Sequence, residues 1–348
     1  MAALLATRLE TAGLEVRTHE LATGRSGLVA RTPSRERRPA LCLTGHLDVV
    51  AVGDAPWLHD PFGADVDGDR LYGRGSSDMK GGLAAIVGAV EQLAGRWDGA
   101  DAGVEVVLTC GEETGCDGAR AVAESGLLGE VGAVLVAEPT ANEPRIAHKG
   151  VLWLQAQTMG EAAHGSAPNR GRNAIVALAS AVAGLDGLDF DVPDHHLLGG
   201  PTVNVGTFRG GANVNSVPDY AMAELDIRLV PGLDPDRALT VVRERMGPAV
   251  ELTPMLSLPV VETAAGDAWV GQVLDVLEPL LGRRPEPAGM APFTDAAVLT
   301  PAYGGPPTIV CGPGDPGQAH RTDEWCSIAR IEEAVEAYVE IARHWCAL

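Results

Sequence analysis

Short apolar segments alternate with helical patterns over residues 1–149, and this alternation narrows the folds that the chain can adopt. The predicted strands are residues 40–44, 104–110 and 133–137, and the predicted helices are residues 82–93 and 118–125. Strands that alternate with helices are typical of an α/β fold with a mostly parallel sheet. In such sheets, binding groups collect beyond the carboxyl ends of the strands. We therefore predict a site at that edge of the sheet.

The pattern changes after Gly150 to the order strand, helix, strand, strand, helix, strand. The segments are residues 151–158, 173–185, 202–208, 220–230, 234–246 and 250–256, with a surface loop at 186–200. This order predicts a four-stranded antiparallel sheet with two helices on one face, a ferredoxin-like α+β domain. A helix at 267–281, a strand at 308–311 and a helix at 328–345 then return to the first domain. We therefore predict one domain from residues 1–149 and 260–348, and an inserted domain from residues 150–259.

Histidine and acidic residues follow the predicted strands where each strand ends. His46 follows the first strand, Glu112 and Glu113 follow the second, and Glu138 follows the third. Two adjacent carboxylates repel each other unless a cation neutralises one of them. This favours a division in which one glutamate is a metal ligand and the other a general base, with a solvated acidic loop as the alternative.

Three further residues extend this set. Asp78 lies in a Gly- and Ser-rich turn ahead of a helix, His320 lies in a Gly/Pro-rich loop, and Asp48 comes two residues after His46. Residues two apart on a strand face the same side, so Asp48 can accept the free N–H of His46. Carboxylate oxygens and imidazole nitrogens are ligands that zinc and similar divalent ions accept. Five such ligands, one of them shared, would form a two-metal hydrolytic site.

Simpler interpretations remain open for these residues one by one. Asp78 can act as the N-terminal cap of the helix that follows it. The run from Gly73 to Asp78 also has some likeness to a dinucleotide-binding loop, although it lacks the final small residue of that motif. His320 taken alone would be an exposed loop histidine.

The charge and cysteine content exclude some classes of function. The chain has 26 basic and 47 acidic side chains, a formal net charge of −21, so the phosphate backbone of a nucleic acid would be repelled. Six scattered cysteines without CxxC spacing fit a reducing compartment, and we expect a cytoplasmic protein without a signal peptide. No apolar stretch is long enough to span a bilayer, so we expect no membrane association.

Five motifs in this order resemble the di-zinc amidohydrolase and metallopeptidase family. That family includes acetylornithine deacetylase, succinyl-diaminopimelate desuccinylase, aminoacylase and glutamate carboxypeptidase. The motifs are GHLDVV from Gly45, GRGSSDMKGG from Gly73, GEETG from Gly111, AEPT from Ala137 and GPGDPGQAHRTDE from Gly312. The fourth motif with the downstream AHKG from Ala147, and the fifth motif, are most similar to the acetylornithine deacetylase branch. Members of the family usually carry a segment ahead of the first helix that this sequence lacks, so a truncated or a misassigned start is expected.

The resemblance implies a role for each residue of the set. Asp78 would bridge two divalent metal ions, zinc with cobalt or manganese as alternatives. His46 and Glu138 would complete one metal site, and Glu113 and His320 the other. Glu112 would be the general base and Asp48 would orient His46. The peptide bond after Asp78 is expected to be cis.

The resemblance also implies that residues 150–259 form a lid that carries a homodimer interface. His164 would reach the active site of the partner, and Asn215 and Arg228 would bind a substrate carboxylate. The residues themselves leave other interpretations open: an exposed loop for His164, a turn before Pro218 for Asn215, and a sheet-face ion pair with Asp226 or Glu224 for Arg228.

The activity implied is hydrolysis of the amide bond of an N-acyl amino acid. Dipeptidase, carboxypeptidase or desuccinylase activity on a short peptide or a succinylated amino acid is the alternative within the same chemistry. A non-catalytic homologue that binds a ligand is the alternative from another class. The stretch Gly289–Asp295 resembles each branch only loosely, so the sequence does not predict the acyl group.

Overall fold

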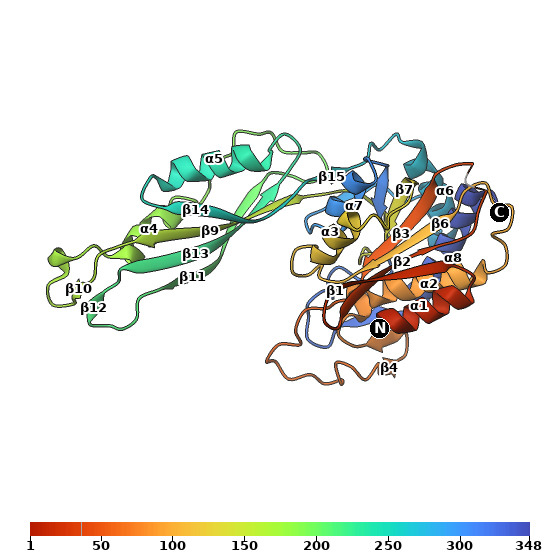
Figure 1. The fold of residues 1–348 in the computed structure, drawn as a ribbon, viewed down its shortest axis with the longest axis horizontal. Helices are drawn as coiled ribbons and strands as arrows, with labels where there is room; N and C mark the ends of the chain where they lie inside the picture. The colour runs from red at the N-terminus through yellow and green to blue at the C-terminus, as the bar shows by residue number, and fades with distance from the viewer. Residues whose placement is uncertain (36) are drawn as a thin grey trace. The chain divides into compact units, whose positions relative to one another are not determined.

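The computed structural model describes residues 1–35 and 37–348 (Figure 1). Internal contacts divide the chain into two compact units. Unit 1 consists of Met1–Ala147, Val261–Gly289 and Thr294–Leu348, and unit 2 of His148–Val260 and Met290–Phe293. The segment 150–259, which the sequence predicts to be an insertion, lies within unit 2.

The main sheet has nine strands with a parallel centre. Along the sheet the order is β1 (Glu15–Ala22), β2 (Arg25–Arg31), β6 (Val104–Thr109), β3 (Ala40–His46), β7 (Val131–Val136), β17 (Thr308–Val310), β8 (Arg145–His148) and β15 (Val261–Glu262), and β16 (Ala288–Met290) pairs with β8. The pairs β6–β3, β3–β7 and β7–β17 are parallel, whereas β1, β2 and β8 pair antiparallel. The predicted α/β fold with a mainly parallel central sheet is therefore confirmed.

The hairpin of β1 and β2 was not predicted from the sequence. Strand β1 is mostly exposed and carries Arg17, His19 and Glu20. Charged side chains are frequent on edge strands, where they discourage pairing with other chains. They also remove the apolar signal on which strand prediction depends. The short β4 (Val66–Asp67), β5 (Arg70–Tyr72) and β18 (Trp325–Ser327) form a small sheet of their own, and each has too few residues to give a detectable pattern.

Among the described residues, unit 1 contains six α-helices: α1 (Ala2–Thr11), α2 (Gly81–Gln92), α3 (Asp117–Glu124), α6 (Ala268–Leu281), α7 (Ala296–Ala302) and α8 (Ile328–Cys346). Helix α2 packs against α8, and α8 against α6. Gly82 in the first turn of α2 is a point of close approach, because a Cβ there would lie 2.1 Å from the carbonyl oxygen of Ala137. The start of α2 therefore lies directly against the chain that leaves β7.

Unit 2 contains a four-stranded sheet in the order β11 (Thr202–Gly210), β13 (Tyr220–Leu229), β9 (Gly150–Met159), β14 (Glu251–Leu258). All pairs are antiparallel, and helices α4 (Ala174–Ala183) and α5 (Pro235–Met246) pack on it. Burial alternates strictly along β13: Ala223, Leu225 and Ile227 join the core under the two helices, and residues between them face the other side. The short β10 (Ala163–His164) and β12 (Ser216–Val217) form a separate ribbon in this unit.

Across the described residues, no helix combines the length and the apolar composition that crossing a bilayer requires.

Candidate metal centre

Four of the predicted residues lie at the carboxyl ends of neighbouring parallel strands in unit 1. His46 is the last residue of β3, Glu112 and Glu113 lie in the turn after β6, and Glu138 follows β7. Strand β3 pairs with both β6 and β7, so these three strand ends are adjacent. The close packing of Gly82 on Ala137 brings the turn before α2 to the same place.

Asp78 lies in that turn, within the segment Ser76–Lys80, and the peptide bond that follows it is cis, as expected. Its two carboxylate oxygens face different histidines. The Oδ1 atom is 3.2 Å from Nε2 of His46, and the Oδ2 atom is 3.5 Å from Nε2 of His320. Asp78 therefore stands between two imidazoles that come from opposite ends of the sequence.

A glutamate completes each side of this arrangement. Nε2 of His46 lies 3.7 Å from Oε1 of Glu138, and Nε2 of His320 lies 3.0 Å from Oε2 of Glu113. Ligand atoms of His46, Glu112 and Glu138 lie within 4.8 Å of one another, as do those of His46, Asp78 and Glu113. The structure thus brings together all five residues that the sequence predicts as metal ligands.

These distances fit divalent ions. Ligand atoms about 2.0–2.1 Å from a tetrahedral zinc are roughly 3.3 Å apart, and the nitrogen–oxygen distances here range from 3.0 to 3.7 Å. In addition, Oε1 of Glu113 is buried and has no hydrogen-bond partner among the described residues. A buried carboxylate oxygen without a partner is costly unless a cation accompanies it.

Burial, and to a lesser degree mutual repulsion, disfavours the charged forms of the carboxyl groups in the cluster. Burial raises the pKa of Glu112 and of Glu138 well above the usual carboxyl value, and neighbouring carboxylates such as Asp78 act in the same direction. Burial opposes protonation of His46, but Glu138 and Asp78 outweigh it and raise the pKa of the imidazole well above its usual value. The charged forms of these carboxyl groups are therefore disfavoured in the protein alone, and divalent ions would stabilise them.

Asp48 acts differently from the sequence-based expectation. Nδ1 of His46 lies 3.0 Å from the backbone carbonyl oxygen of Asp48, whereas the nearest carboxylate oxygen is 3.6 Å away. The carboxylate instead accepts backbone N–H groups of the turn after β6, from Gly111 at 2.6 Å and from Glu112 and Glu113 at 3.3 Å. Asp48 therefore contacts the imidazole through its main chain and positions the two glutamates through its side chain.

Two buried acidic residues near the cluster were not predicted from the sequence. Asp295 accepts a hydrogen bond from the hydroxyl of Thr109, and its Oδ1 atom has no partner in the described part of the chain. Glu324 is completely buried and hydrogen-bonds to the loop that carries Asp78. The sequence offered a signal only for Glu324, since it ends the motif that contains His320.

The remaining predicted residues lie in unit 2. His164 is exposed on β10, with Nδ1 2.7 Å from Oγ of Ser166. Asn215 lies in the turn before β12, and its carbonyl oxygen accepts the N–H of Gly165 at 2.7 Å. The segments of His164 and Asn215 are therefore neighbours.

Arg228 lies on the face of β13 that is turned away from the helices. Its Nη2 atom is 2.9 Å from Oδ2 of Asp226, and its guanidinium lies 5.4 Å from the ring centre of Phe293. The sheet-face ion pair that the sequence left open as an alternative is thus present.

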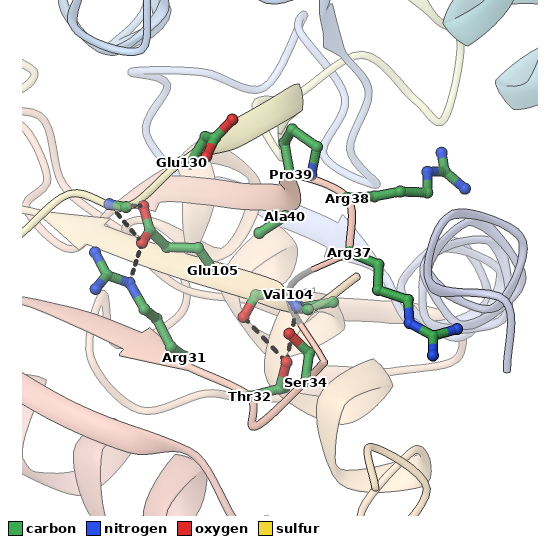
Figure 2. Close-up of a pocket in the computed structure, with 12 residues that line it drawn as sticks. Arg31, Thr32, Ser34, Arg37, Arg38, Pro39, Ala40, Val104, Glu105 and Glu130 are labelled. Carbon is green, nitrogen blue, oxygen red and sulfur yellow. Dashed lines mark hydrogen bonds and ion pairs between the residues drawn. The ribbon is translucent and has the colours of Figure 1, made fainter. Parts of the chain in front are cut away.

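A separate cavity of about 330 Å³ opens where β3 and β6 begin (Figure 2). It therefore lies at the amino ends of these parallel strands, opposite the carboxyl ends that carry the acidic cluster. Its arginines already have partners. Arg31 pairs with Glu105, Arg37 lies 3.3 Å from Asp101, and Arg38 lies over the ring of Trp345. None of the predicted site residues lines this cavity.

Residues 42–344 match the family described as Peptidase family M20/M25/M40. The chain belongs to this family. It is 30% identical to an acetylornithine deacetylase of Photorhabdus laumondii over 99% of this chain and 89% of the relative. It is also 34% identical to a probable succinyl-diaminopimelate desuccinylase of Staphylococcus aureus, over 57% of this chain and 55% of the relative.

The fold agrees with this assignment. An M20 family metallo-carboxypeptidase of Sulfolobus solfataricus superposes with a TM-score of 0.83 at 20% identity, over 100% of this chain and 94% of that one. The resemblance drawn from the five sequence motifs is therefore confirmed, and the chain is a hydrolase that acts on amide bonds.

The geometry of the cluster predicts that divalent ions stabilise the protein. After treatment with a chelator, addition of Zn²⁺ or Co²⁺ should raise the melting temperature, because an ion at 100 times its Kd stabilises the folded state by about 2.7 kcal/mol. His46→Ala should abolish most of this shift, since it removes one of the two candidate nitrogen ligands next to Asp78. The exposed His344→Ala is the matched control and should respond like the wild type in differential scanning fluorimetry. A wild-type protein whose melting temperature ignores every divalent ion would contradict the assignment.

Proposed function

We propose that this protein hydrolyses the amide bond of N-acyl amino acids with the help of two divalent metal ions. Zinc is the proposed metal, with cobalt or manganese as alternatives, because all three accept this set of oxygen and nitrogen ligands. The observation that carries the proposal is the position of Asp78, whose two carboxylate oxygens face His46 and His320 separately. The acetylornithine deacetylase among the relatives supports an N-acyl amino acid as substrate.

His46 and Glu138 would hold one ion, Glu113 and His320 the other, and Asp78 would contact both. Ions bound in this way would lower the pKa of a water molecule toward ~7 and polarise the carbonyl group of the amide. Asp48 would help to position these ligands, because its carboxylate accepts the backbone N–H of Glu113 and its carbonyl oxygen lies next to Nδ1 of His46.

Glu112 is the proposed general base. It is buried, and its carboxylate lies within 4.8 Å of ligand atoms of His46 and Glu138, close enough to act on a water molecule held by those residues. Its carboxylate would accept a proton as water attacks the amide carbon. It would then deliver that proton to the nitrogen as the C–N bond breaks, so that the amine leaves in neutral form.

Arg228 and Asn215 are proposed to bind the α-carboxylate of the substrate. The pair with Asp226 uses Nε and Nη2 of Arg228, which leaves its Nη1 group to donate to a carboxylate. Asp226 and the Phe293 ring hold the guanidinium in one orientation, so less side-chain freedom is lost when a substrate binds.

A homodimer formed through unit 2 is also proposed. Strand β11 is the last strand in the order of its sheet, and an edge strand presents unpaired backbone groups. Helix α4 has the almost wholly apolar sequence AIVALASAVA, yet only Ala174 and Leu178 are buried, and Val176 is 60% exposed. Phe208 on β11 is 40% exposed. An apolar helix beside a sheet edge favours association with a second copy.

The cysteines and the net charge support the proposed location and the proposed type of substrate. All six cysteines are buried free thiols, which favours a reducing, cytoplasmic location. The net charge of −21 argues against nucleic acid as a partner. A small N-acyl amino acid or short peptide is therefore the proposed substrate.

A substrate panel tests the reaction. N-acetyl-ornithine should be hydrolysed faster than N-succinyl-diaminopimelate, N-acetyl-methionine or simple dipeptides when Zn²⁺ or Co²⁺ is present. Preference for the succinylated compound would favour the activity named for the relative from Staphylococcus aureus, and preference for dipeptides would favour a peptidase. Metal binding without turnover of any amide would favour a ligand-binding homologue.

Glu112→Gln should lower kcat by about 10²–10⁴-fold, which is the usual contribution of a general acid–base group, and should leave the metal content unchanged. The control is Glu124→Gln, which alters an exposed glutamate on α3. Kinetics with the best substrate of the panel and metal analysis by mass spectrometry measure both effects. Activity close to that of the wild type would remove Glu112 as the base.

His164 is proposed to act in the active site of the partner subunit, where it would stabilise the negative charge on the carbonyl oxygen. His164→Ala and Glu112→Gln should each be nearly inactive as pure dimers. Subunits mixed by dissociation and reassociation should recover about a quarter of wild-type activity, because half of the dimers are mixed and each mixed dimer has one complete site. The absence of recovery, with mixed dimers verified by mass spectrometry, would place His164 in its own subunit's site or outside catalysis.

A further inference from the structure

The carboxylate of Glu324 lies at the centre of the loop that leads to Asp78. Glu324 has no exposed surface, and both of its oxygens accept two hydrogen bonds each. Oε2 accepts from Nη1 of Arg74 at 2.7 Å and from the N–H of Gly75 at 2.9 Å. Oε1 accepts from the N–H of Ser77 at 2.8 Å and from the N–H of Asp78 at 3.0 Å.

Three of these four hydrogen bonds go to the main chain. A buried ion pair with Arg74 alone would need only one carboxylate oxygen and would leave the backbone of the loop to find other partners. Here the loop from Arg74 to Asp78 instead curves around a single side chain. The peptide N–H of Asp78 is fixed directly, so the direction in which its carboxylate leaves the main chain is fixed as well.

The same carboxylate belongs to the segment that carries His320. Glu324 follows His320 by four residues, and the N–H of Gly73 donates to the carbonyl oxygen of Glu324 at 2.8 Å. Directly beyond these residues, β18 pairs with β5, with Trp325 opposite Tyr72. The loops of Asp78 and His320 are thus joined by strand pairing at one end and by the Glu324 side chain further in.

A close backbone contact supports this connection. A Cβ on Gly314 would lie 2.1 Å from the carbonyl oxygen of Ser77. The beginning of the His320 loop therefore also lies against the turn that holds Asp78. Across these two adjacent loops, Oδ2 of Asp78 lies 3.5 Å from Nε2 of His320.

We propose that Glu324 is a positioning residue of the metal centre, which holds Asp78 where its two carboxylate oxygens reach His46 and His320. It does this through the N–H groups of Ser77 and Asp78, without binding a metal itself. The inference rests on the proposed two-metal function. It predicts that loss of the Glu324 carboxylate weakens metal binding beyond what loss of a buried ion pair elsewhere would do.

The test compares Glu324→Gln with the matched control Glu105→Gln. Glutamine keeps the shape of glutamate but has one acceptor oxygen, so two of the four donors lose their partner. Glu105 is equally buried, pairs with Arg31 and accepts the N–H of Gly129 at 2.9 Å, but it lies away from the candidate ligands. Glu105→Gln therefore reproduces the loss of a buried carboxylate without altering the Asp78 loop.

The readout is Co²⁺ titration of the chelator-treated full-length chain, followed by visible absorption and by the number of ions bound. Glu324→Gln should weaken Co²⁺ binding by about 10- to 100-fold, as is typical for residues that orient ligands, and should change the absorption spectrum of the bound cobalt. Glu105→Gln should bind Co²⁺ like the wild type, although both variants melt at lower temperature than the wild type.

Glu324→Asp provides a second variant in case the glutamine variant does not fold. It keeps the negative charge beside Arg74 but is one methylene shorter, so it cannot reach all four donors, and it should also bind Co²⁺ more weakly. Wild-type affinity and an unchanged spectrum in a folded Glu324 variant, or an equal loss in Glu105→Gln, would overturn the positioning role. Failure of the wild type itself to bind Co²⁺ would instead overturn the proposed two-metal function.

Discussion

Burial of several carboxyl groups at the ends of three parallel strands is the physical constraint that dominates the candidate metal centre of unit 1. Glu112, Glu113 and Glu138 lie near Asp78, and burial raises the pKa of all three glutamates, with repulsion by Asp78 acting in the same direction. Two histidines offset only part of this charge. Buried backbone contacts hold this acidic cluster together, which suits it to bind cations. Membership of the family indicates that the bond on which such cations would act is an amide.

Backbone packing makes this convergence possible. Gly82 and Gly314 lie where any side chain would collide with the carbonyl oxygens of Ala137 and Ser77. Asp48 and Glu324 have related roles, since each uses its carboxylate to accept main-chain N–H groups of a loop that carries candidate ligands. Two acidic residues that are not candidate ligands therefore orient the candidate ligands by accepting backbone N–H groups. The geometry of the centre depends on these loops as much as on the strands.

Much of the fold was accessible from the sequence because burial leaves a pattern. The central strands β3, β6 and β7 are almost fully buried and therefore appear as continuous apolar runs, and β13 shows strict alternation because only one face is covered. The hairpin of β1 and β2 was missed because its first strand is exposed and charged. Helix α7 was missed as well, since its seven residues contain Pro301 and give too short a pattern to detect.

The candidate ligands His46, Asp78, Glu113, Glu138 and His320 were determined by the sequence itself, because each stands at a strand end or in a Gly-rich loop within an ordered set of motifs. The tertiary structure alone decided how they are held. It shows that Asp48 contacts His46 through its carbonyl group, that Arg228 is paired with Asp226, and that Glu324 supports the Asp78 loop. Motif and periodicity record which side chains are present, whereas the partner of each side chain depends on the folded conformation of its segment. The contact between Glu324 and Asp78 further requires that two loops distant in the chain pack together.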